Sequence, residues 1–235
     1  MKTILTVIIM LMAVTLIVAC TTQSPADTEV VVLRDITDMH LAQPDTNEIL
    51  SLYELENKWN GGIFRLSNLS NVSFNQAIET KLDSRNKWLS NELDRDKEIR
   101  NFKKKVSEII IKNEKDSIGK KSSSIYLPIA RELNKLSTGN MQKRVLLVYS
   151  DLMENTSEMS FYNKQKLGLL KTNPDSIVKY FDSQLVLKNL DGIKIFLIYK
   201  PSDEQADYEY KIVSGFYKNI FEGKGATVEI TASIN

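Results

Sequence analysis

Three apolar runs, separated by stretches with helical spacing, place the strongest constraint on how this chain folds. The runs are Glu29–Asp35, Arg144–Asp151 and Ile193–Tyr199. Short, nearly continuous apolar runs of this kind are typical of strands that are covered on both faces, as in parallel sheets. The chain is therefore expected to bury a central sheet between layers of helices.

The remaining elements alternate with these runs. Two further strands are predicted at Ile63–Leu66 and Ala226–Ile234. Helices are predicted at Asn47–Trp59, Ile125–Leu136, Ser176–Gln184 and Asp203–Phe221. Strands that alternate with helices form mainly parallel sheets. The predicted fold class is α/β: a doubly wound, mainly parallel sheet flanked by helices.

A long, highly charged segment covers residues 76–113. Its apolar residues follow one another mostly at steps of three, four or seven, and no glycine or proline interrupts it. This spacing predicts one long helix, or two in series, with a single apolar stripe. The stripe is expected to pack on the sheet of the same chain; the alternative is a helix that binds a partner.

The first nineteen residues have the layout of a secretory signal. Lys2 is followed by an uncharged, mostly apolar run that ends at Ala19, directly before Cys20. The segment Ile17-Val18-Ala19-Cys20 resembles the lipobox of bacterial lipoproteins. The resemblance implies cleavage after Ala19, lipidation of Cys20 and a place on the extracytoplasmic side of a bacterial envelope membrane. An ordinary signal or an uncleaved anchor are the alternatives.

This interpretation divides the chain into a signal peptide (1–19), a lipidated cysteine with its tether (20–28) and a folded domain (29–235). Cys20 is the only cysteine among 235 residues, which excludes an internal disulfide. Removing residues 1–19 removes Lys2 and no acidic residue, so 30 basic and 30 acidic residues remain. A net charge of zero argues against nucleic acid as a partner. The expected contact with the membrane is through the lipid on Cys20.

Two aspartates stand at the ends of the two strongest predicted strands, Asp35 and Asp151. Ligands of open α/β sheets bind beyond the carboxyl ends of the strands, so both carboxylates lie where a site is expected. A serine loop, Ser122–Ser124, lies between them in sequence. Carboxylate and hydroxyl oxygens suit a Mg²⁺-type cation.

On these residues the chain resembles the von Willebrand factor type A (vWA) family across residues 29–234. The family's adhesion site begins with Asp-x-Ser-x-Ser after the first strand, adds a threonine from a later loop, and ends with an aspartate after a central strand. Asp35, Thr37, Ser123 and Asp151 match these positions in order, with Ser122 and Ser124 as alternatives to Ser123. The resemblance implies a bound Mg²⁺ or Mn²⁺ that binds an acidic group of a protein partner, without enzymatic turnover.

One position departs from the family pattern. Met39 stands where the second hydroxyl of the first motif belongs, and a thioether is a poor ligand for Mg²⁺. The site then has four oxygen donors from the protein instead of five, unless Asp38 or a water molecule compensates. A simpler alternative is that Asp35 and Asp151 cap the amino termini of helices.

Two other functions remain open. The chain could be a metal-free scaffold that docks through its long helix or its sheet edge. It could also be a metal-dependent hydrolase, in which Asp35, Asp38, Asp151 and Glu154 hold a metal that activates water. His40 is the only histidine, so no pair of histidines can bind zinc.

Overall fold

The computed structural model describes residues 25–36, 42–69, 77–114 and 123–234. Six strands form one sheet in the order β3-β2-β1-β4-β5-β6. They are β1 (Asp27–Asp35), β2 (Gly61–Leu69), β3 (Ala77–Leu82), β4 (Lys143–Tyr149), β5 (Ile193–Ile198) and β6 (Thr227–Thr231). All neighbouring pairs are parallel except β2 and β3, which are antiparallel.

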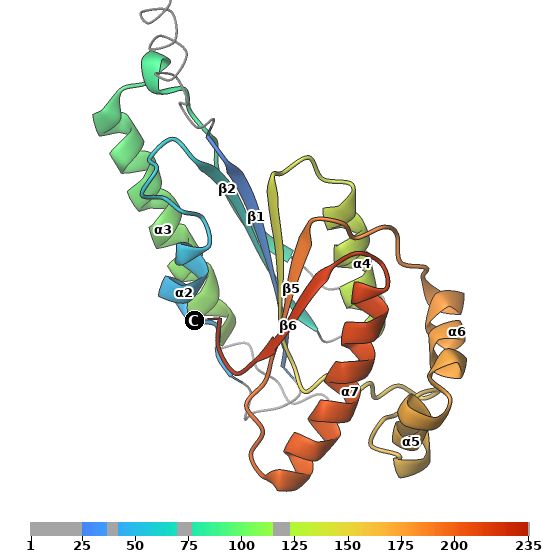
Figure 1. Cartoon of the computed structure of the whole chain (residues 1–235). Helices are drawn as coiled ribbons and strands as arrows, with labels where there is room; N and C mark the ends of the chain where they lie inside the picture. The colour runs from blue at the N-terminus through green and yellow to red at the C-terminus, as the bar shows by residue number, and fades with distance from the viewer. Residues whose placement is uncertain (1–24, 37–41, 70–76, 115–122, 235) are drawn as a thin grey trace, which may run out of the picture.

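Helices cover both faces of the sheet (Figure 1). One face is covered by α2 (Thr46–Ser51) and α3 (Glu92–Glu114). The other is covered by α4 (Tyr126–Ser137), α5 (Lys164–Thr172), α6 (Pro174–Gln184) and α7 (Glu204–Glu222). This three-layer arrangement confirms the predicted α/β class with a mainly parallel sheet flanked by helices.

The apolar side chains of β1 contribute to two hydrophobic cores, one on each face of the sheet. Val30 and Val32 pack toward α2 and α3, whereas Val31 and Leu33 pack toward the α4–α7 layer. Successive side chains of a strand point to opposite faces, so a strand covered on both faces must be apolar at every position. This is why β1, β4 and β5 were recognisable in the sequence as continuous apolar runs.

The expected helix over residues 76–113 is wrong at its amino end. Residues Ala77–Leu82 form strand β3, and the helix on this segment, α3, begins only at Glu92. Ile78, Thr80 and Leu82 are the less exposed positions of β3 and alternate with exposed ones, a period of two. Thr80 is 8% exposed, so a polar residue occupies one of the inward positions and conceals the strand period in the sequence.

Two other predicted boundaries also differ. The helix expected over Asn47–Trp59 is short: α2 ends at Ser51, and Glu54 has a positive φ of 50°, which a helix does not allow. Helix α5 was not predicted. Among the described residues, no helix is both long enough and apolar enough to cross a bilayer.

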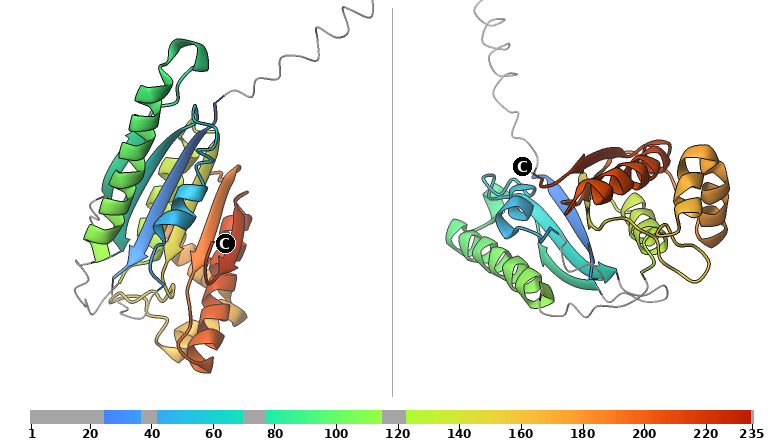
Figure 2. Two further views of the ribbon diagram at one scale, coloured as in Figure 1. Left: turned by 90° about the vertical axis from the view of Figure 1, so that its left-hand side faces the viewer. Right: turned by 90° about the horizontal axis from the view of Figure 1, so that it is seen from below.

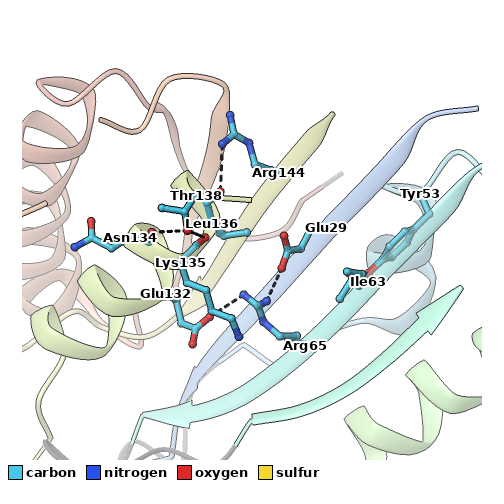
Figure 3. Close-up of polar contacts among 10 residues, drawn as sticks. All are labelled: Glu29, Tyr53, Ile63, Arg65, Glu132, Asn134, Lys135, Leu136, Thr138 and Arg144. Carbon is cyan, nitrogen blue, oxygen red and sulfur yellow. Dashed lines mark hydrogen bonds and ion pairs between the residues drawn. The ribbon is translucent and has the colours of Figure 1, made fainter. Parts of the chain in front are cut away.

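A buried ion pair links the sheet to α4 (Figure 3). The guanidinium of Arg65, on β2, pairs with Glu29 on β1 and with Glu132 on α4, in the latter case at 2.9 Å. The side chains of Arg65 and Glu29 are 5% and 7% exposed. Arg65 is at the middle of β2 and Glu29 is the third residue of β1, so both charges lie away from the carboxyl ends of the strands.

Candidate functional site

The carboxyl ends of β1 and β4 bring two of the predicted site residues to one edge of the sheet. The strands are adjacent and parallel, and their register pairs Arg34 with Tyr149. Asp35 therefore lies beside Ser150, and Asp151 follows directly. The hydroxyl of Ser150 donates a hydrogen bond to Oδ2 of Asp35 at 3.1 Å. Asp35 is only 1% exposed, so its carboxylate is buried at the carboxyl end of β1.

The chain turns sharply after β4. Leu152 has a φ of 61°, which a leucine rarely adopts, and it is completely buried. Two side chains stabilise the turn: Ser150 Oγ accepts from the backbone N–H of Leu152, and Asp151 Oδ1 accepts from that of Met153, both at 2.9 Å. Strained backbone of this kind is held in place only by surrounding contacts, and it often marks a functional loop.

The second carboxylate oxygen of Asp151 is also engaged. The hydroxyl of Tyr162 donates to Oδ2 of Asp151 at 2.9 Å. Tyr162 is 59% exposed, so this bond lies at the solvent-facing side of the site. Asp151 does not cap a helix, which excludes the simpler interpretation for this residue.

The serine loop reaches the same place. Ser123 forms an isolated antiparallel bridge with Asn155: its N–H donates to Asn155 O at 3.1 Å and its C=O accepts from Asn155 N at 2.9 Å. The bridge joins the start of the α4 segment to the loop after β4. Three of the four predicted metal ligands, Asp35, Ser123 and Asp151, therefore come from one cluster of loops. Thr37 lies outside the described residues, as do Asp38, Met39 and His40.

Glu154 was predicted as a metal ligand only in the hydrolase alternative and was not among the four ligands of the adhesion site. Its Oε2 accepts from the backbone N–H groups of Ile125 and Tyr126, both at 2.9 Å, so it caps the start of α4. Only 3% of the residue is exposed. Burial raises the pKa of Glu154, hydrogen bonds from Tyr126, Ile125 and Ser124 lower it, and the charge of Asp35 raises it further.

The negative charge of Asp35 raises the pKa of Glu154, so the two carboxylates are close enough to interact. Two buried carboxylates repel one another, and a divalent cation nearby would offset that repulsion. The described residues nevertheless contain no group of three or more His, Cys, Asp or Glu side chains placed to hold a metal ion. Any cation would rely on hydroxyl, backbone or water oxygens for much of its coordination.

Comparison of the sequence with protein-family models and with curated proteins found no match.

Proposed function

We propose that this chain is a bacterial lipoprotein, anchored through Cys20, whose vWA-like domain binds a protein partner at the carboxyl ends of β1 and β4. The sheet order, with β3 the one antiparallel strand among the six described, is compatible with that family. Cys20 and the signal peptide lie outside the described residues, so the anchor rests on the lipobox resemblance.

The main support for the proposed binding site is that separate chain segments meet at one edge of the sheet. Three separate chain segments, ending at Asp35, beginning at Ser123 and following Tyr149, meet at one edge of the sheet through hydrogen bonds that connect them. The segments supply carboxylate and hydroxyl groups at the place where ligands of open α/β sheets bind.

The donor chemistry fits a hard divalent cation such as Mg²⁺ or Mn²⁺. Asp35, Thr37, Ser123 and Asp151 would hold it through oxygen atoms, and it would offer an open position to an acidic group of the partner. The cation would supply positive charge next to the buried carboxylates. Asp35 brings a negative charge that is already shielded from solvent, so it is the residue expected to contribute most.

Calorimetric titration with Mg²⁺ and Mn²⁺ tests the site. The mature protein is expected to bind Mn²⁺, and Asp35→Ala is expected to weaken that binding at least about tenfold, which corresponds to roughly 1.4 kcal/mol. Asp35→Asn is the matched variant, because it retains an acceptor for Ser150 while it removes the charge. Equal affinity in all three proteins would exclude Asp35 as a ligand.

Tyr162→Phe is expected to have the opposite effect. The variant removes the hydroxyl that occupies Oδ2 of Asp151, so a cation no longer competes with that hydrogen bond. We expect a gain of up to about 1 kcal/mol in cation binding, or roughly fivefold, with little change in stability because Tyr162 is exposed. Tyr208→Phe, on a second exposed tyrosine, is the control. A loss of affinity in Tyr162→Phe would contradict the proposed role of Asp151.

A second candidate function is that of a metal-free scaffold. It is favoured by the hydrogen bonds that Asp151 makes with both oxygens, to Met153 N and Tyr162 Oη, because these satisfy the carboxylate without a cation. Partner binding in excess chelator separates the two functions. Binding that persists in chelator supports the scaffold, and binding that is lost and then restored by Mg²⁺ supports the adhesion site.

A further inference from the structure

An apolar tip projects from one end of the molecule. It consists of Trp88, Leu89 and Leu93, whose exposed fractions are 85%, 86% and 78%. These are the three most exposed large apolar side chains of the described residues, and they lie within six positions of one another. Compact clusters of exposed apolar side chains mark sites of contact with a partner or a membrane.

The tip is held firmly on the fold. Arg95, which is 1% exposed, donates to the carbonyl oxygens of Asn60 at 2.6 Å and Asp83 at 2.8 Å. These bonds fix the first turn of α3 to the chain just before β2 and just after β3. Asn86 and Asn91 accept hydrogen bonds from the backbone N–H groups of Trp88 and Leu93 respectively. The exposed side chains therefore project from an ordered support.

The tip lies at the end of the sheet where β1 begins. Ser84 donates to the carboxylate of Asp27, the first residue of β1, at 3.3 Å, and Arg85 N donates to Trp59 O at 3.1 Å. Figure 2 shows the turn η1 (Lys87–Leu89) and the start of α3 extending beyond that end of β1. Asp27 follows Cys20 by seven residues, which span at most about 25 Å when fully extended. A lipid on Cys20 would hold this end of the domain near the bilayer.

We propose that the apolar tip inserts into the interface of the membrane that holds the lipid anchor. This inference rests on the lipid anchor of the proposed function. Tryptophan and leucine are side chains that partition into the boundary between headgroups and acyl chains. The charges around the tip are nearly balanced: Lys81 pairs with Asp83, and Arg85 pairs with Glu98. Insertion is therefore driven by apolar contact and does not require anionic lipid.

Insertion of the tip would fix the orientation of the whole domain. β1 contains nine residues, so its two ends lie roughly 26 Å apart at about 3.3 Å per residue. The tip is at the amino end of β1, and Asp35 is at the carboxyl end. The candidate site would consequently face away from the membrane, toward a partner in the aqueous space.

Fluorescence of Trp88 in the mature lipoprotein tests this proposal. Trp59→Phe leaves Trp88 as the one tryptophan, since the chain contains two. The protein is reconstituted into phosphatidylcholine vesicles whose acyl chains carry bromine, and iodide is the aqueous quencher. We expect a blue-shifted emission, at least about twofold quenching by the brominated lipid, and protection from iodide. Leu89→Ser/Leu93→Ser in the same background should reduce the quenching by brominated lipid.

Ile111→Ser/Tyr208→Ser, which alters exposed apolar residues elsewhere, is the matched control and should leave the quenching unchanged. Vesicle flotation reports on the anchor separately. If the protein floats with the vesicles while Trp88 stays accessible to iodide, insertion of the tip is wrong, but the lipid anchor is supported. Protection from iodide without quenching by brominated lipid would also overturn it, in favour of contact with a protein or a second copy. Protein that does not float would overturn the anchor, and the tip proposal with it.

Discussion

Arg65→Met is expected to lower the free energy of unfolding by about 3–5 kcal/mol. The substitution leaves Glu29, whose side chain is 7% exposed, beside Glu132 without the guanidinium that now joins them (Figure 3). The cost comes from the carboxylates that remain, because a buried charge that loses its partner keeps its desolvation penalty. Urea denaturation of the mature protein, followed by circular dichroism, measures the change.

The double variant Arg65→Met/Glu29→Leu separates the two causes. If the cost of Arg65→Met arises from the stranded charge, the double variant should recover much of the lost stability, as apolar replacements of buried ion pairs often do. Lys143→Ala is the surface control: its ion pair with Glu54 is 39% and 64% exposed and should contribute at most about 1 kcal/mol. A double variant as unstable as Arg65→Met alone would show that the cost is one of packing.

Glu154→Ala is the second change with a large expected effect, a loss of about 2–4 kcal/mol. It leaves the buried N–H groups of Ile125 and Tyr126 without their acceptor. Thermal and urea unfolding measure this loss. Asp203→Ala, at the exposed amino terminus of α7, removes a cap of the same type and should cost about 1 kcal/mol.

The pH dependence of stability provides a separate test of Glu154. Its pKa is raised in the folded state, mainly by burial, so the folded protein holds this proton more tightly than the unfolded chain does. The contribution is fully present below the unfolded pKa, about 4.3, and is lost as the pH rises through the higher folded value. Glu154→Gln cannot titrate, so this decline should be absent from it when both proteins are compared in chelator. An identical decline in the variant would assign it to other groups.

The central strands were determined by local sequence. β1, β4 and β5 are apolar at nearly every position because both faces of the sheet are covered, and this pattern is visible without knowledge of the neighbours. The ends of β1 and β4 also placed Asp35 and Asp151 correctly at the carboxyl edge, since parallel strands direct their carboxyl ends to one side. Helices α4 and α7 followed from their apolar spacing for the same reason.

Tertiary structure alone decided the rest. β3 is a strand because it pairs with β2, and its buried Thr80 conceals the alternation that local sequence would need to show. Glu154 caps a helix that begins 28 residues before it, and no local pattern records such a partner. Leu89 and Leu93 fit the apolar stripe of a longer helix in sequence, but the strand before them places both side chains outside the core. The sequence determined where most strands and helices lie. Strands buried on both faces appear as continuous apolar runs, and helices buried on one face show regularly spaced apolar residues. Contacts between distant residues leave no such pattern, so the surroundings of each carboxylate and the position of the apolar tip depend on the assembled fold.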